Sequence, residues 1–308
     1  MWKEILKMTK KIIFSAGGTG GHILPAVKVM KHFYDKGYNV IMVTDSRGRV
    51  FLKNHPKINS YIIKTDTLTN KNFLRKVLSI FIIIKSIIKS AIILKKEKPN
   101  LVFGFGGYSS FPICFASKFF GIPLMIYENN MILGRTNRYL LLLCKKIFVA
   151  QNIGKNFPHK FNKKLIEVGP ILDKSIINSS FEEKKSGKIF FSILVLGGSQ
   201  GAEVFGNIIP NVIKMLNDQG YSIYIKQQCV EKQKEDIINF YKKNNIKSDI
   251  FVFREDILKL MSSSNLAITR CGASSTAELA HTLTPFIAVP LPHSIDNHQY
   301  LNAKYYEK

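Results

Sequence analysis

The chain has 308 residues, 46% hydrophobic and 21% charged, a composition typical of a globular protein of about two domains. Its 45 lysines and arginines against 21 acidic residues give a formal charge of +24, which favours anionic partners: nucleic acid, an anionic membrane face or a phosphorylated substrate. Four widely spaced cysteines argue against a disulfide framework or a zinc site, and RNA-binding signatures and zinc-finger spacings are absent, so we expect no nucleic-acid partner.

The N-terminal residues 1–8 are interrupted by charge too often to form the apolar core of a signal peptide. No stretch of about 20 residues is free of charge, so we expect no transmembrane helix. A reducing cytoplasm fits the cysteine pattern.

The first motif is Gly-Gly-Thr-Gly-Gly-His at residues 17–22, between an apolar run at 12–14 and a helical pattern. Such a strand-to-helix turn presents backbone amides and the positive end of a helix dipole, which suit phosphate. Neither the dinucleotide fingerprint nor the P-loop pattern fits it. His22 could take up a proton near neutral pH. A tight turn with a helix-start histidine is the alternative.

Strands are predicted at 40–44 and 61–63, followed by an amphipathic helix at 73–94. A helical wheel places its serines and most of its basic residues on one side and a wide apolar arc on the other. We expect a sheet to cover part of this arc, leaving Phe81 and Ile88 facing outward beside Lys85 and Lys89. A basic-rimmed apolar patch suits an anionic bilayer surface. Burial of the helix on both sides is the alternative.

Next come a strand at 101–103, a second glycine loop at 104–110 and a helix beginning near 111. A strand at 123–127 ends in Glu128, and strands at 147–149 and 166–168 close the unit. Polar side chains and glycine loops at the carboxyl ends of parallel strands predict a ligand site. A connection between domains is predicted at 169–188.

The same pattern then restarts, with a strand at 193–196, a glycine loop at 197–202 and a helix to about 218. Further strands are predicted at 221–225, 250–253, 266–269 and 286–290. The predicted fold is therefore α/β, with two Rossmann-like doubly wound domains, 1–168 and 189–308, facing a cleft.

The turn at 270–278 combines glycine, hydroxyls and Glu278. Hydroxyls and amides suit a diphosphate, and a carboxylate suits the hydroxyls of a ribose. A helix-start acid is the alternative for Glu278. His293, Asp296 and His298 lack the supporting cluster that a metal site needs.

Six motifs in this order resemble the MurG family of peptidoglycan glycosyltransferases. They are Gly-Gly-Thr-Gly-Gly-His at 17–22, Gly-Gly-Tyr at 106–108, Glu-x-Asn at 128–130, Gly-Gly-Ser-Gln-Gly-Ala at 197–202, Arg-x-Gly-Ala-x-x-x-x-Glu at 270–278 and Asp-x-x-Gln at 296–299. The resemblance implies inverting transfer of N-acetylglucosamine from UDP-GlcNAc to the 4-hydroxyl of lipid I, giving lipid II. It also implies a peripheral position on the cytoplasmic face of the bacterial plasma membrane.

The resemblance assigns His22, or alternatively Glu128, as the catalytic base. Acceptor-binding positions are implied at Gly18, Tyr108, Glu128 and Asn137. Donor-binding positions are implied at Thr19, Gly20, Gly21, Asn130, Ser199, Gln200, Phe253, Arg254, Ala273, Ser274, Ser275, Thr276, Glu278, His298 and Gln299. The predicted membrane patch comprises Phe81, Lys85, Ile88 and Lys89.

Some positions depart from the family pattern. The usual His-Glu-Gln-Asn becomes Tyr127-Glu128-Asn129-Asn130. Leu172 stands where the family has an arginine that contacts the donor phosphate, and Lys174 could make that contact instead. The sequence ends at Lys308, where relatives continue, so we expect an incomplete second domain. No Asp-x-Asp occurs to anchor a cation on a diphosphate, so we expect no metal or other cofactor. A non-catalytic UDP-sugar-binding protein and a transferase acting on another lipid are the alternative functions.

Overall fold

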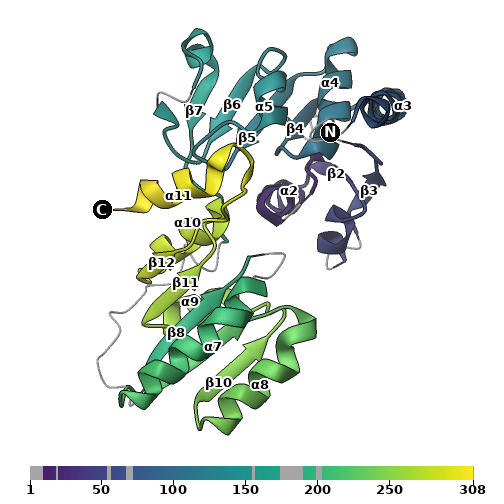
Figure 1. Ribbon diagram of the computed structural model, residues 1–308. Coiled ribbons are helices and arrows are strands. Elements are labelled where there is room, and N and C mark those ends of the chain that lie inside the picture. The colour runs from purple at the N-terminus through teal and green to yellow at the C-terminus, as the bar shows by residue number, and fades with distance from the viewer. Residues whose placement is uncertain are drawn as a thin grey trace. The chain divides into compact units, whose positions relative to one another are not determined.

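The structure, a computed structural model, describes residues 10–18, 20–53, 57–66, 72–154, 157–173, 190–198 and 203–307. The chain divides into two compact units, Met1–Ile171 and Leu172–Lys308. Each is built on a parallel sheet with helices on its faces (Figure 1), which confirms the predicted α/β class of two Rossmann-like domains. Most of the predicted connection at 169–188, including Lys174, lies outside the described residues.

The first unit contains a seven-stranded parallel sheet in the order β3-β2-β1-β4-β5-β6-β7. Its strands are β1 (Lys11–Ser15), β2 (Asn39–Thr44), β3 (Asn59–Ile62), β4 (Leu101–Gly104), β5 (Leu124–Glu128), β6 (Lys146–Val149) and β7 (Leu165–Glu167). Strand order reverses between β1 and β4, which pair in register from Ile12 and Leu101 onward. Open α/β sheets bind ligands outside the carboxyl ends of strands at such a reversal.

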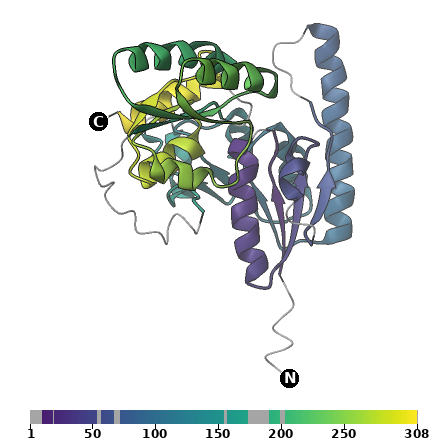
Figure 2. The ribbon, with the colours of Figure 1, turned by 90° about the horizontal axis from the view of Figure 1, so that it is seen from below.

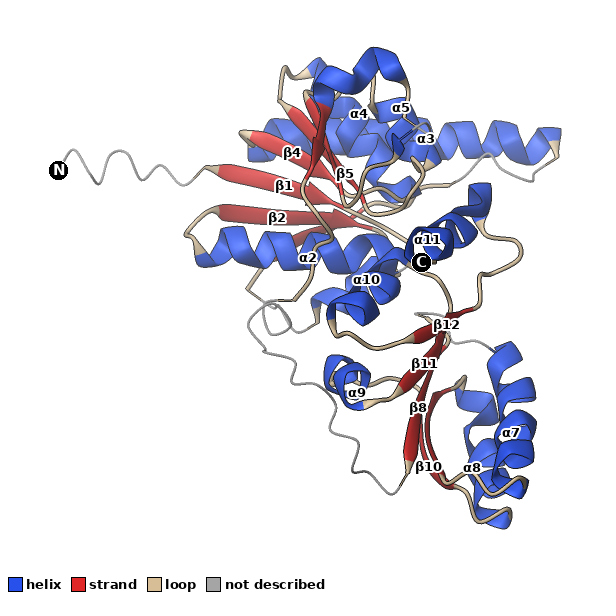
Figure 3. Ribbon diagram, turned by 90° about the vertical axis from the view of Figure 1, so that its left-hand side faces the viewer, coloured by secondary structure: helices blue, strands red, loops and turns tan. Residues whose placement is uncertain are grey.

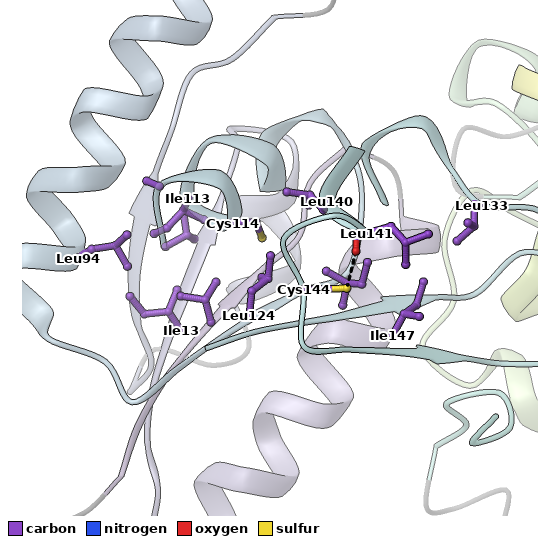
Figure 4. Close-up of a cluster of buried hydrophobic side chains, with 14 of the residues drawn as sticks. Ile13, Leu94, Ile113, Cys114, Leu124, Leu133, Leu140, Leu141, Cys144 and Ile147 are labelled. Carbon is purple, nitrogen blue, oxygen red and sulfur yellow. Dashed lines mark hydrogen bonds between the residues drawn. The ribbon is translucent and has the colours of Figure 1, made fainter. Parts of the chain in front are cut away.

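The helices of this unit are α2 (Gly20–Asp35), α3 (Phe73–Glu97), α4 (Phe111–Phe119) and α5 (Arg135–Leu140), with 3-10 turns η1 (Gly48–Leu52), η2 (Tyr108–Ser110) and η4 (His159–Lys164). Alternate residues of β1 enter different cores, because side chains along a strand alternate between faces. Ile13 joins Ile113, Leu124 and Ile147 on one face (Figure 4), whereas Phe14 packs on the other. Burial of both faces explains the uninterrupted apolar runs of these strands.

The long helix α3 faces its unit with three serines and only a few of its apolar residues. Ser79, Ser86 and Ser90 are buried against the unit, as are two residues near the end of the helix, while most of the isoleucine and phenylalanine side chains are exposed. α3 runs along the flank of the unit (Figure 2) and packs on α4. Phe81 and Ile88 face outward as expected, and Ile87, from the predicted arc, packs against the core together with Ile93 and Leu94. The alternative of a helix buried on both sides is wrong.

Hydrogen bonding explains why serine can form the buried side of α3. Ser79, Ser86 and Ser90 each donate to the carbonyl four residues earlier, at 2.7–2.8 Å, so each hydroxyl is satisfied within the helix. Ser79 also donates to Asp66 and Ser86 to the Lys64 carbonyl. Small side chains with satisfied hydroxyls let the helix approach the unit closely, beside the apolar contacts that Ile87, Ile93 and Leu94 make with the core.

Helix α3 is also the one helix in the described ranges that is long and apolar enough to cross a membrane, judged by length and composition alone. Only 28% of its most apolar window is buried, so it differs from the core helix of a globular domain. Lys85 and Lys89 interrupt the apolar run. The apolar surface of α3 is therefore a feature that the function must account for.

The second unit contains a five-stranded parallel sheet in the order β10-β9-β8-β11-β12. Its strands are β8 (Phe191–Leu196), β9 (Ile223–Gln228), β10 (Lys247–Phe251), β11 (Leu266–Thr269) and β12 (Phe286–Ala288). Its helices are α7 (Glu203–Asp218), α8 (Lys234–Lys243), α9 (Ile257–Ser263), α10 (Ala273–His281) and α11 (His298–Tyr306), with 3-10 turns η5 (Glu231–Gln233) and η6 (Ile295–Asn297). Figure 3 shows α7 and α8 on one face of this sheet and α9 on the other, matching its two buried clusters.

Candidate active site

The first glycine loop follows β1 and leads into α2 with almost no side-chain bulk. Gly18 has φ +81°, a conformation that favours glycine. A Cβ added to Gly17 would lie 1.3 Å from Ser109 Oγ, so only glycine fits there. Gly20 is buried and Gly21 exposed in the first turn of α2, while Thr19 lies outside the described residues. The loop therefore has the close packing and helix start that phosphate binding requires.

The second glycine loop packs on the first. Gly106 and Gly107 have φ +84° and +80°, and a Cβ on Gly107 would lie 2.5 Å from the Gly17 carbonyl oxygen. The two loops thus meet backbone to backbone at the reversal between β1 and β4. Tyr108, half-buried, begins η2 directly after this contact.

His22 lies in the first turn of α2, against the second glycine loop. Its Nδ1 is 3.0 Å from the carbonyl oxygen of Phe105. Because a carbonyl only accepts hydrogen bonds, Nδ1 carries the hydrogen and Nε2 carries the lone pair of the neutral ring. A Cβ on Gly106 would lie 3.0 Å from the same Nδ1, so glycine makes room for the imidazole. This tautomer suits a general base acting through Nε2.

Glu128 ends β5 and is only 1% exposed. One carboxylate oxygen accepts from the amide and side-chain nitrogens of Asn130, at 3.1 and 3.0 Å. The other accepts from the Gly134 amide and from Asn137 Nδ2, each at 2.9 Å. Both oxygens are therefore engaged in shaping the segment between β5 and α5, which is a positioning role.

Asn137, predicted to touch the acceptor, is also buried. Besides Glu128, its Nδ2 donates to the Tyr127 carbonyl at 3.0 Å. Its Oδ1 is buried and has no hydrogen-bond partner within the described chain. The same Nδ2 would lie 3.5 Å from a Cβ on Gly106, which places Asn137 beside the loop that holds His22. The structure thus brings together His22, Tyr108, Glu128, Asn130 and Asn137, while the roles assigned to them stay predictions.

In the second unit the glycine loop begins with Gly197 and Gly198, the latter at φ +83°. Ser199 and Gln200, predicted phosphate contacts, lie outside the described residues. Phe253 is exposed just beyond β10. Arg254 is held by Asp256 through two hydrogen bonds of 2.7 and 2.8 Å and by Asp249 at 2.9 Å, and the Asp256 carboxylate raises the pKa of this guanidinium.

The predicted diphosphate turn forms the start of α10. Ala273, Ser274 and Ser275 are half-buried there, with Glu278 one turn later. Thr276 is buried, and its hydroxyl donates to the carbonyls of Gly272 and Ala273 at 3.1 and 3.2 Å. Its side chain is therefore turned into its own helix rather than toward a ligand.

The predicted sugar contacts lie at the start of α11. Asp296 and Asn297 precede this helix with φ +52° and +55°, a left-handed pair that costs backbone energy. His298 Nδ1 is 2.8 Å from the Ile295 carbonyl, and Gln299 Oε1 accepts from the Leu291 amide at 2.9 Å. These bonds fix the 291–299 segment. In the parts of the chain that the structure describes, no group of three His, Cys, Asp or Glu residues could hold a metal ion.

Comparison with known proteins identifies the family. Residues 12–149 match the glycosyltransferase family 28 N-terminal domain, and 192–308 match the family 28 C-terminal domain. A UDP-N-acetylglucosamine--N-acetylmuramyl-(pentapeptide) pyrophosphoryl-undecaprenol N-acetylglucosamine transferase from Pelagibacter ubique is 38% identical over 98% of this chain and 83% of its own length. The crystal structure of Acinetobacter baumannii MurG superposes with a TM-score of 0.76 at 29% identity, covering 96% of this chain and 83% of that one.

The chain belongs to the MurG family of glycosyltransferases. A similarly named transferase from Rickettsia canadensis is 34% identical over 97% of this chain and 83% of its own length. The glycotransferase of kitacinnamycin, at 10% identity and a TM-score of 0.67, shares the fold alone.

Sequence analysis missed two residues, one in each unit, that contact the glycine loops of this MurG-family chain. Asp45, directly after β2, accepts from Gly18 in the first glycine loop, and Gln228, at the end of β9, accepts from Gly197. Their position at the carboxyl ends of strands was the available signal.

Proposed function

We propose that this chain transfers N-acetylglucosamine from UDP-GlcNAc to the 4-hydroxyl of the muramyl sugar of lipid I, giving lipid II. The observation that carries this proposal is the match of both units to transferases named for undecaprenol-linked acceptors. The arrangement of His22 between two glycine loops supports it. The reaction places the chain in peptidoglycan synthesis, and so in cell-wall biogenesis, cell shape and division.

The mechanism is a single inverting displacement. His22 Nε2 takes the proton of the acceptor hydroxyl as its oxygen attacks the anomeric carbon, and the bond from that carbon to the UDP oxygen breaks. The exposed Phe253 offers a face on which uracil stacks, and Glu278 accepts from the ribose hydroxyls. Amides at the start of α10 stabilise the departing diphosphate.

Transfer is expected to proceed at an unchanged rate in EDTA. The chain has no Asp-x-Asp pair to anchor a cation on the diphosphate, so helix-start amides supply the compensating positive field. The measurement is transfer of labelled N-acetylglucosamine to a lipid I analogue with and without EDTA. A loss of product that added Mg²⁺ or Mn²⁺ restores would contradict this prediction.

We also propose that α3 holds the chain on the cytoplasmic face of the plasma membrane. Phe81 and Ile88 are 65% and 57% exposed, and further apolar side chains surround them on the same helix. Lys85 and Lys89 lie among them, and basic residues flank both helix ends. An apolar surface with lysines at its rim suits the headgroup region of an anionic bilayer.

Replacing Phe81 and Ile88 together with serine is expected to weaken binding to anionic vesicles at least about tenfold, because two large side chains no longer leave water. Sedimentation with phosphatidylglycerol vesicles measures this. The matched control replaces Ile208 and Met215 of α7, which are 54% and 62% exposed, with serine. This control variant is expected to bind the vesicles as tightly as the unmodified chain does. Equal vesicle binding by the folded α3 variant and the unmodified chain would reject the membrane role of α3.

A further inference from the structure

Asp45 is a buried carboxylate that the proposed mechanism does not use. It follows β2, the strand beside β1, and accepts hydrogen bonds from two main-chain amides, Gly18 at 3.1 Å and Gly48 at 2.9 Å. Arg47 donates to it as well, through Nη2 at 2.7 Å and Nε at 3.3 Å. Ser109, from the second glycine loop, donates at 3.4 Å. One side chain therefore contacts both glycine loops.

These contacts fix how the two loops pack. Gly17 lies so close to Ser109 that no Cβ fits between them, and Gly107 lies against the Gly17 carbonyl. Because the N–H of Gly18 donates to Asp45, this hydrogen bond fixes the orientation of the peptide bond between Gly17 and Gly18. Burial alone would raise the pKa of Asp45, but hydrogen bonds from Arg47, Gly48 and Gly18 together hold it below its usual value. Asp45 is therefore a carboxylate acceptor at neutral pH.

Gln228 has the equivalent place in the second unit. It ends β9, the strand beside β8, and its Oε1 accepts from the amide of Gly197 at 3.1 Å. Its Nε2 donates to the carbonyl of Val252 at 3.2 Å, directly before the exposed Phe253. It thus joins the start of this glycine loop to the segment predicted to hold uracil.

We infer that Asp45 and Gln228 are a matched pair of positioning residues, each of which orients the first residues of the glycine loop of its own unit from the end of the neighbouring strand. In both units the polar side chain engages the N–H of a glycine at the beginning of the loop and a group from a second site segment. Asp45 acts on the loops around His22, and Gln228 acts on the donor loop. The inference rests on the proposed function, which assigns the acceptor to the first unit and UDP chiefly to the second.

The inference predicts kinetic effects that separate by substrate. In Asp45→Asn, the side-chain amide is a donor that faces the N–H groups of Gly18 and Gly48, which also donate. We expect kcat/KM for the lipid I analogue to fall about tenfold, and the Kd for UDP to stay within about twofold of its unmodified value. Gln228→Met removes both hydrogen bonds, and is expected to raise the Kd for UDP about tenfold while the KM for the lipid I analogue stays within about twofold. Calorimetry measures UDP binding, and initial rates give the kinetic parameters.

Two exposed residues provide matched controls: Asp35→Asn at the end of α2, and Gln219→Met just after α7, both expected to leave every parameter unchanged. Hydrogen exchange supplies a readout independent of turnover. Exchange at Gly18 and in the 105–110 peptide is expected to rise at least about tenfold in Asp45→Asn, and at Gly197 in Gln228→Met.

Folded variants whose loops exchange at the unmodified rate would overturn the inference. So would equal changes in acceptor and donor parameters, because a purely structural loss affects both substrates through the folded fraction. If the unmodified chain transfers no sugar, the proposed function fails, and the loop-exchange and UDP-binding results still decide whether Asp45 and Gln228 position their loops.

Discussion

Replacing His22 with alanine is expected to lower the rate of sugar transfer by about 10²–10⁴-fold and to leave UDP binding unchanged. The imidazole donates from Nδ1 to the Phe105 carbonyl, which leaves the lone pair of the neutral ring on Nε2, the atom proposed to take the acceptor proton. UDP is predicted to bind chiefly through residues of the second unit. Initial rates with labelled UDP-GlcNAc and a calorimetric titration with UDP measure the two quantities.

Two variants isolate the proton-transfer role of His22. His22→Asn keeps a donor near the Phe105 carbonyl but supplies no base, so it is expected to be as inactive as the alanine variant. His32→Ala alters another histidine of α2, in its last turn, and is expected to retain full activity. Substantial transfer by His22→Asn would show that another group removes the proton.

Replacing Glu128 with alanine is expected to lower the free energy of unfolding by about 3–5 kcal/mol, because Asn130, Gly134 and Asn137 lose a buried charged acceptor. Glu128→Gln keeps the shape but places an amide donor against these donors, and we expect a loss of about 1–3 kcal/mol. Urea unfolding monitored by fluorescence or circular dichroism measures both changes.

The same Glu128 variants test the choice of base. Because both carboxylate oxygens already accept hydrogen bonds, we expect folded Glu128→Gln to lose less transfer activity than His22→Ala. Rates corrected for the folded fraction make this comparison. A Glu128→Gln variant that is fully folded yet as inactive as His22→Ala would assign proton removal to Glu128 instead.

The positions of the strands along the chain were the part of the fold most accessible from sequence. Apolar runs such as 12–14 and 193–196 are buried on both faces of parallel sheets, so their composition alone predicts them. The strand β9 extends further than predicted, because Lys226 and Gln227 break its apolar pattern. Gln227 is nevertheless buried, since its side chain pairs with the Tyr241 hydroxyl at 2.7 Å and the Phe205 carbonyl at 3.3 Å.

The residues of the candidate site were predictable where a reactive or ligand-binding residue type directly follows a predicted strand. Glycine loops, His22 and Glu128 all stand at carboxyl ends of strands, where a parallel sheet collects its ligands. Asp45 and Gln228 stand at similar ends, but their importance depends on the N–H groups that they meet, which only the folded chain reveals. Likewise, the outward position of Phe81 and Ile88 on α3 was predicted, but the burial of its serines was not, because it depends on hydroxyls that bond back within the helix.

The central claim is that this chain moves N-acetylglucosamine onto a lipid-linked muramyl acceptor. The most direct measurement incubates the unmodified chain with labelled UDP-GlcNAc and a lipid I analogue, and identifies the product by mass and linkage. We predict one added N-acetylglucosamine on the muramyl 4-hydroxyl, in the β-configuration that inversion gives. Protein that binds UDP but yields no transfer product, or that glycosylates only a different lipid, would contradict the account.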